Sequence, residues 1–188
     1  MKILLAKPCR HGGYTLTEML IVIAIGAILT GLAVSAFPNL SKNNHMIGDV
    51  NTLVGHVNLA RSETIKRNLP TALCQTDDSQ AATPDCDGIA ANWANGWLVF
   101  VDDNGNQTFD AGEFLITRGS PSGSIDIVVS HGEIGFANDG FLATGSTLFN
   151  LCDDRGINHG RQMSLSITGR PEISKTFVAN TDCTDTSP

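Results

Sequence analysis

GGYTLTEMLIVIAIGAILTGLAVSAF, residues 12–37, is the most informative stretch of this sequence. It places one carboxylate, Glu18, ahead of residues 19–37, in which no side chain ionises. An uncharged and mainly apolar run of about 18 residues or more is long enough to cross a bilayer as a helix. The sequence therefore predicts a membrane-spanning helix over residues 14–37.

The residues on either side of this helix predict its orientation. Ahead of it lies a leader without any acid, which carries the basic residues Lys2, Lys7 and Arg10. Positive charge holds that end in the cytoplasm, so residues 38–188 are expected to form an exported head domain. A conventional secretory signal peptide, cut after Ala36, stays open as an alternative, because small residues lie near the end of the apolar run.

The start of the helix resembles the N-terminus of type IV prepilins and pseudopilins. The shared features are two glycines, an aromatic residue, a glutamate and an unbroken apolar helix. The resemblance implies that a prepilin peptidase removes residues 1–13 by cutting between Gly13 and Tyr14, and that Tyr14 is then N-methylated. It also implies that Glu18, the fifth residue of the mature chain, neutralises the N-terminal amine of a neighbouring subunit in a filament.

Composition predicts a folded, acidic domain behind the helix. Of 188 residues, 41% are apolar and 16% are charged, which excludes a disordered chain. Lys plus Arg number 12 against 19 Asp plus Glu, which argues against a strongly basic nucleic-acid binder. Three of the basic residues lie in the leader, so the mature chain would carry 9 basic and 19 acidic residues, a net charge of −10.

Loss of the leader removes Cys9 and leaves four cysteines, Cys74, Cys86, Cys152 and Cys183. An even number of cysteines in an exported domain favours two disulfides, and four cysteines allow three pairings. We favour the local pairs, Cys74–Cys86 around an irregular loop and Cys152–Cys183 at the C-terminal tail. Because the sequence has no Cys-x-x-Cys spacing and its histidines are scattered, no metal site or cofactor is predicted.

The head begins with an amphipathic pattern over residues 41–68, and Pro70 follows as a stop. Its apolar positions recur at the three-and-four spacing of a helix: Met46, Val50, Leu53, Val57, Ala60 and Thr64. The period then changes to two, which predicts strands over residues 96–101, 113–117, 124–129, 147–152 and 162–168. The expected fold class is α+β, with a long N-terminal helix packed on an antiparallel β-sheet.

Several blocks of the head resemble the GspH/FimT group of minor pseudopilins. They are residues 51–68, Cys74, residues 96–102 and residues 168–170. The resemblance implies an initiating or tip-proximal subunit of a type IV pilus or a type II secretion pseudopilus, and not an enzyme. The implied partners are other pilin or pseudopilin subunits, the prepilin peptidase and an inner-membrane assembly platform.

The sequence contains no convincing catalytic motif. The chain lacks a Gly-x-Ser-x-Gly elbow, a His-Glu-x-x-His motif and a phosphate-binding glycine loop, and Ser146, His131 and Asp139 are interpreted as ordinary turn residues.

The segment 102–113 is similar to a calcium-binding loop. Its oxygen-bearing residues have the spacing of such a loop: Asp102, Asn104, Asn106, Asp110 and Glu113. Gln107 stands where that motif needs glycine, so an ion-free hairpin loop is favoured and calcium binding is the alternative.

DNA binding is the alternative function. Some FimT-type proteins bind DNA during natural transformation through a C-terminal Gly-Arg-x-Arg segment, which corresponds here to residues 169–172 with Glu172 in place of the second arginine. A phosphate-binding face would require Arg155, Arg161 and Arg170 to cluster on folding. Residues 151–188 carry four basic and five acidic side chains, so DNA binding is not favoured.

Overall fold

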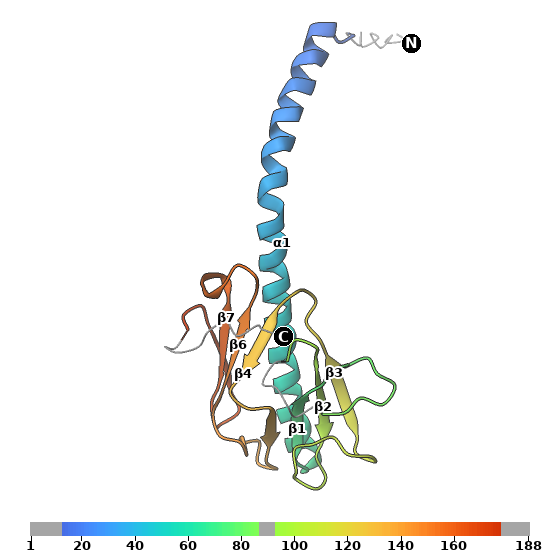
Figure 1. The fold of residues 1–188 in the computed structure, drawn as a ribbon, viewed down its shortest axis with the longest axis vertical. Coiled ribbons are helices and arrows are strands. Elements are labelled where there is room, and N and C mark those ends of the chain that lie inside the picture. Colours follow the sequence, from blue (N-terminus) through green and yellow to red (C-terminus); the bar gives the residue numbers. More distant parts are fainter. Residues whose placement is uncertain (1–12, 87–92, 178–188) are drawn as a thin grey trace, which may run out of the picture. The chain divides into compact units, whose positions relative to one another are not determined.

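The computed structural model describes residues 13–86 and 93–177, without the side chains of residues 32–36. The chain divides into two compact units, residues 1–41 and residues 42–188, and each is described by itself. Helix α1 (Leu16–Arg67) contributes residues to both units (Figure 1). From here on, the head means this second unit, residues 42–188, whereas the sequence prediction begins the head at residue 38. All the strands of the described residues lie in it.

Helix α1 is continuous from Leu16 to Arg67, so the helix predicted over residues 14–37 and the amphipathic pattern of residues 41–68 belong to one element. It ends at Arg67 because Asn68 adopts a left-handed conformation (φ 54°) and Pro70 cannot extend the helical hydrogen bonding. Within the head, the side chains predicted to face the core are all buried: Met46, Val50, Leu53, Val57, Ala60 and Thr64.

The head has two four-stranded antiparallel sheets, where the sequence predicts one. Sheet A has the order β3-β2-β1-β5 and is built from β1 (Thr71–Gln75), β2 (Trp97–Val101), β3 (Leu115–Gly119) and β5 (Glu133–Phe136). Sheet B has the order β4-β6-β7-β8 and is built from β4 (Asp126–Val129), β6 (Thr147–Cys152), β7 (Arg161–Leu165) and β8 (Pro171–Ser174). A short 3-10 helix, η1 (Ile157–His159), lies between β6 and β7.

The main core joins α1 to both sheets. Leu53 of α1, Trp97 of β2 and Phe149 of β6 belong to one cluster of fully buried side chains. Alternation along the strands of sheet A directs a second, smaller cluster to the opposite face, where Leu98 and Phe100 lie under two long loops. Those two loops, residues 76–86 and 102–113, contain Cys86 and the oxygen-rich segment that the sequence analysis compares with a calcium loop.

Three strands have no counterpart among the predicted ones, and the reasons differ. All five residues of β1 are buried, so its sequence shows no alternation of apolar and polar positions. Strand β5 is four residues long, and β8 begins with a proline and exposes half of its residues, which is typical of an edge strand. The predicted strand 162–168 is shorter in the structure because the backbone turns between Ser166 and Gly169.

Candidate functional site

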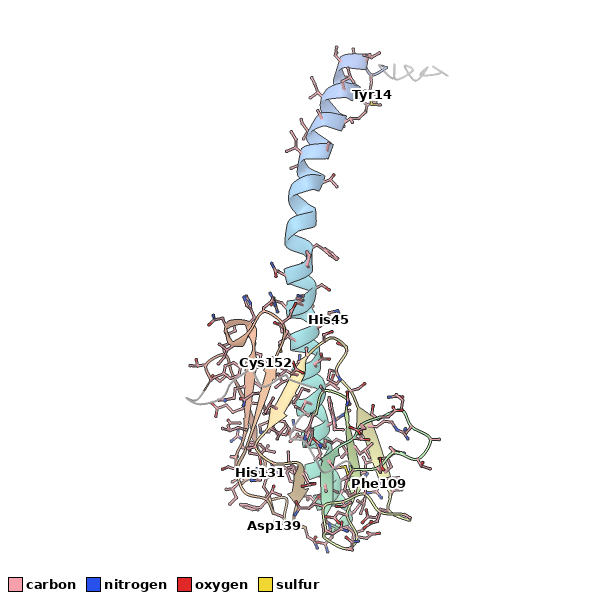
Figure 2. All side chains as sticks on the ribbon, in the orientation of Figure 1. Tyr14, His45, Phe109, His131, Asp139 and Cys152 are labelled. Carbon is pink, nitrogen blue, oxygen red and sulfur yellow. A yellow bond between two sulfur atoms is a disulfide. The ribbon has the colours of Figure 1, made fainter. Side chains whose placement is uncertain are left out.

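The first turn of α1 presents the residues predicted for processing and assembly. The hydroxyl oxygen of Thr15 accepts a hydrogen bond from the backbone N–H of Glu18 at 3.2 Å, which caps the helix ahead of Leu16. Gly13, Tyr14 and Glu18 are all exposed, and Tyr14 lies at the start of the helix in Figure 2. In this chain by itself the carboxylate of Glu18 and the bond predicted to be cut, between Gly13 and Tyr14, are therefore accessible.

Apolar side chains are exposed along the N-terminal unit. Positions 19–23 are consecutive and all exposed, so no side of the helix is covered there. More than half of each of these side chains is accessible: Leu16, Met19, Leu20, Ile21, Val22, Ile23, Ile25, Ile28, Leu29, Phe37 and Leu40. A soluble monomer rarely exposes an apolar surface of this extent, and such surfaces are typical of interaction sites.

No helix in the described part of the chain is long and apolar enough to span a membrane.

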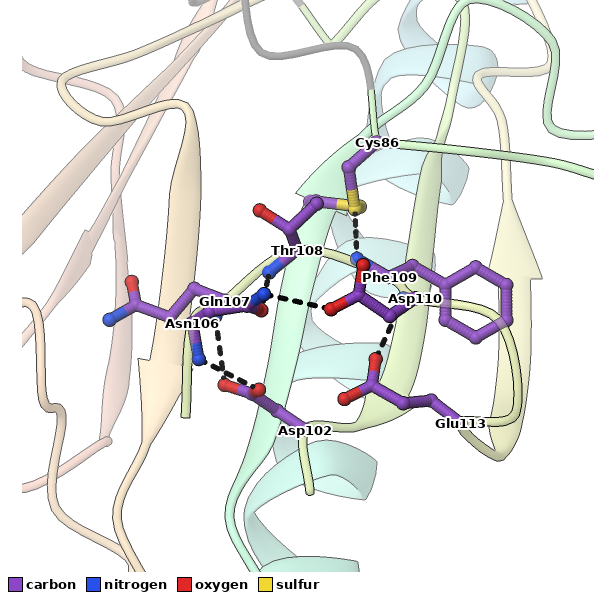
Figure 3. Close-up of a disulfide and its surroundings, with 9 residues drawn as sticks. Cys86, Asp102, Asn106, Gln107, Thr108, Phe109, Asp110 and Glu113 are labelled. Atoms are coloured by element: carbon purple, nitrogen blue, oxygen red, sulfur yellow. Dashed lines mark hydrogen bonds between the residues drawn. A yellow bond between two sulfur atoms is a disulfide. The ribbon is translucent and has the colours of Figure 1, made fainter. Parts of the chain in front are cut away.

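One of the two predicted disulfides lies within the described residues. Cys74 of β1 is bonded to Cys86, 12 residues later, and the bond closes the loop over the outer face of sheet A (Figure 3). The Sγ atom of Cys86 also accepts the backbone N–H of Phe109 at 3.0 Å, which connects this loop to the loop 102–113. Cys152 is disulfide-bonded too, but Cys183 lies outside the described residues, so that pairing stays a prediction.

The loop 102–113 uses its oxygen atoms for internal hydrogen bonds. The buried carboxylate of Asp102 accepts backbone N–H groups of Gly105, Asn106 and Gln107 at 2.9–3.1 Å. Glu113 closes the loop, because its two carboxylate oxygens accept the backbone N–H groups of Asp103 and Asp110. These contacts, several of which Figure 3 shows, account for the position of both carboxylates without an ion.

The amide side chains of the same loop converge on Asp110. Asn104 and Asn106 each donate a hydrogen bond to Asp110 Oδ2 at 2.8 Å, and these bonds lower the pKa of Asp110. Gln107 adopts a left-handed conformation (φ 63°) at the position where a calcium loop has glycine. Among the described residues, no three or more His, Cys, Asp or Glu side chains are grouped so as to hold a metal ion.

The three arginines considered for DNA binding lie at two ends of sheet B. Arg161 begins β7 and pairs with Leu151 near the end of β6, whereas Arg170 follows the turn at the other end of β7. Arg155 lies just beyond β6 and is engaged by Asp153, whose carboxylate accepts hydrogen bonds from Nε and Nη2. Burial alone would raise the pKa of Asp153, but the hydrogen bonds from Arg155 outweigh it and hold that pKa below 3.8.

Arg170 lies beside a polar cavity of about 390 Å³, which Ser164, Ser166 and Glu172 also line. Arg161 donates to the carbonyl oxygens of His159 and Gly160.

The turn residues considered for catalysis are not joined. His131 and Asp139 are labelled in Figure 2. His131 Nδ1 shares a hydrogen bond with the hydroxyl of Ser130, and Asp139 accepts the backbone N–H of Phe141. The described contacts of His131 and Asp139 are therefore local, as expected for turns.

Sequence reasoning missed a polar cluster where α1 enters the head. Lys42 donates to both carboxylate oxygens of Asp154 at 2.6–2.7 Å, and Arg155 Nη1 donates to Asn43 Oδ1 at 2.9 Å. A cavity of about 410 Å³ opens beside them, lined also by His45. The partners are 112 residues apart in the chain, so no local pattern signals these bonds.

Comparison with known proteins assigns the fold and its N-terminal motif to a class. Residues 9–34 match the prokaryotic N-terminal methylation motif, and residues 49–169 match the family described as type II transport protein GspH. The second match covers well over half of the chain. The chain therefore belongs to the GspH family, and with its methylation motif it is a minor pseudopilin of the type IV pilin class.

Individual relatives agree with this assignment. The pilin-like protein PilA1 of Thermus thermophilus is 34% identical over 102 residues, which are 54% of this chain and 54% of PilA1. The chain thus matches about half the length of this curated relative.

Two crystal structures of the type IV minor pilin FimU of Pseudomonas aeruginosa (strain PAO1) match with TM-scores of 0.51 and 0.53 at 16% identity. They cover 68% and 72% of this chain and 90% and 92% of FimU, and they confirm the α+β pilin-like fold.

Proposed function

We propose that this chain is a subunit of a type IV pilus or a type II secretion pseudopilus and supports the assembly of the filament, as part of its initiating or tip complex. The observation that carries the proposal is the N-terminal unit: a helix with exposed apolar side chains and one carboxylate, Glu18, at its start. The match to the methylation motif over residues 9–34 supports processing between Gly13 and Tyr14 by a prepilin peptidase.

The apolar helix needs an apolar environment before and after assembly. Removing apolar surface from water is favourable by roughly 25 cal/mol per Å², so a helix with this much exposed apolar surface is unstable in water by itself. We propose that residues 14–37, of which residues 32–36 are described without side chains, anchor the subunit in the bacterial inner membrane as a single span, with a cytoplasmic N-terminus. The proposal rests on the sequence, in which residues 19–37 carry no ionisable side chain, and not on the described helix. The head then lies in the periplasm, and the helix moves from lipid into the filament core, where neighbouring helices replace the lipid.

In this proposal, Glu18 selects the correct axial position of the subunit when its helix moves from the membrane into the filament. A carboxylate and an ammonium group in apolar surroundings each carry a large desolvation penalty, which is offset when they pair with good geometry. We propose that Glu18 pairs with the α-amine of Tyr14 in a neighbouring subunit, so that an incorrect axial position leaves both charges unpaired. The subunit acts by binding other pilin-type subunits and the assembly platform, and the proposal assigns it no catalytic step.

Substitution of Glu18 tests this function. Glu18→Ala removes a charge from the helix, so the variant should still insert into the membrane but should be absent from sheared filaments. Glu172→Ala, which removes an exposed carboxylate from the head, is the matched control and should enter filaments like the wild type. Normal entry of Glu18→Ala into filaments, in cells without a wild-type copy, would refute the pairing.

The genes beside this one distinguish the two machines. Neighbouring genes for other minor prepilins would favour the pilus, and a secretion operon would favour the pseudopilus.

A DNA-binding minor pilin of the natural-transformation uptake machinery is the second candidate. The observation that favours it is the exposed Arg170 beside a cavity that two serine residues also line, since arginine and serine side chains both bind phosphate oxygens. Glu172 lines the same cavity and opposes an anion there. The acidic balance of the chain also opposes it, with 19 Asp plus Glu against 12 Lys plus Arg.

A further inference from the structure

His56 and Trp97 connect α1 to β2 through a hydrogen bond in the core of the head. The indole Nε1–H of Trp97 donates to Nδ1 of His56 at 2.9 Å, and the two rings meet edge to face with centroids 5.8 Å apart. Trp97 is fully buried and His56 is half-buried. Because the indole nitrogen can only donate, the bond exists only while Nδ1 of His56 carries no proton.

The surrounding backbone leaves these rings little room to separate without disturbing the core. Gly119 of β3 pairs with Trp97, and a Cβ atom at Gly119 would lie 2.6 Å from the Trp97 ring and 2.9 Å from Cε1 of His56. Both rings therefore press against the backbone of β3. If Nδ1 of His56 were protonated, it would repel the indole nitrogen of Trp97, and the rings could not separate by moving toward β3. The repulsion would therefore disturb the packing of α1 against sheet A.

No described charged side chain is placed to stabilise a protonated His56. On α1, the residues one turn away do not titrate: Thr52, Leu53, Leu59 and Ala60. From sheet A, β2 presents Trp97 and β3 presents Gly119. The neighbouring Arg118 directs its guanidinium to the carbonyl oxygens of Ser79 and Ala81. In agreement with this environment, burial is what lowers the pKa of His56 from its ordinary value of 6.5.

We propose that the His56–Trp97 contact is a pH-sensitive connection between α1 and sheet A. When Nδ1 takes a proton from solvent, two N–H donors face each other, and the bond that holds the Trp97 indole to α1 is lost. Since folding opposes protonation of His56, this contribution to stability is fully present above about pH 6.5 and is lost as the pH falls through the lower pKa of the folded head. Acidification outside the cytoplasm would thus loosen the head around α1.

Tryptophan emission of the full-length protein in mild detergent tests this proposal. Between about pH 8 and pH 5, the wild type should show a change in Trp97 emission with a midpoint below 6.5. His56→Gln keeps an acceptor for the indole N–H but does not titrate, so this variant should lose the transition. His45→Gln, which changes an exposed histidine on the same helix, is the matched control and should keep it.

A second measurement needs no variant. In proton NMR spectra of the wild type, the indole N–H resonance of Trp97 should move with the same midpoint, while that of Trp93 should not. Retention of the emission transition in His56→Gln would overturn the proposal. So would a Trp97 resonance that stays unchanged to about pH 5 in the folded protein.

Discussion

Replacement of both Cys74 and Cys86 by alanine should lower the free energy of unfolding of the head by about 3 kcal/mol. The disulfide joins two residues that are 12 positions apart, and the chain entropy released when a loop of this size is no longer closed accounts for that magnitude. The backbone N–H of Phe109 also loses its acceptor, the Sγ atom of Cys86, which adds up to about 1 kcal/mol.

Thermal unfolding in mild detergent measures this loss. Trp93 and Trp97 are both fully buried in the head, so their emission reports the unfolding of the head and not of the N-terminal unit. For a domain of this size, about 3 kcal/mol should lower Tm by roughly 6–12 °C. Thr83→Ala, an exposed change in the same loop, is the control and should unfold like the wild type. A decrease in Tm of less than about 2 °C in the double variant would refute the reasoning.

Three further predictions concern the core, acid stability and DNA. Leu53→Ala opens a cavity in the main core and should cost about 2–5 kcal/mol in urea unfolding, whereas Ile65→Ala, at a side chain 56% exposed, should cost less than about 1 kcal/mol. Because the pKa of Asp153 lies below 3.8, its ion pair with Arg155 stabilises the head above that pH. The stability difference between wild type and Arg155→Ala should therefore shrink as the pH falls below 3.8. In gel-shift assays, DNA binding near physiological salt should be weak or undetectable. A clear salt-dependent shift that Arg170→Gln abolishes would instead make DNA capture the primary function.

Local periodicity explains which parts of the fold the sequence predicts. A helix repeats every 3.6 residues, so the spacing from Met46 to Thr64 identifies its buried face directly. The same argument fails for β1, which is buried on both faces, and for the separation into two sheets. Which strands pair depends on contacts such as Thr71 with Phe136, which no local pattern encodes.

For the candidate sites too, the sequence predicts the local features but not the contacts between distant residues. The short spacing of Cys74 and Cys86 predicts their disulfide, and the structure confirms it. The spacing from Asp102 to Glu113 predicts an oxygen-rich loop, but it does not show that backbone N–H groups take up both carboxylates. A count of basic residues includes Arg155 among the cations that could bind phosphate, whereas in the structure Arg155 forms an ion pair with Asp153. Contacts between distant residues decide which polar groups are available, and a single sequence does not contain them.

The intact mass of the protein extracted from the membranes of producing cells tests most directly whether the chain is processed as a pilin-type subunit. The prediction is a chain that has lost residues 1–13, begins at Tyr14 and carries one added methyl group, while Gly13→Val leaves the full-length precursor. A mature chain that begins after Ala36, or an unprocessed wild type in cells that contain an active prepilin peptidase, would contradict it.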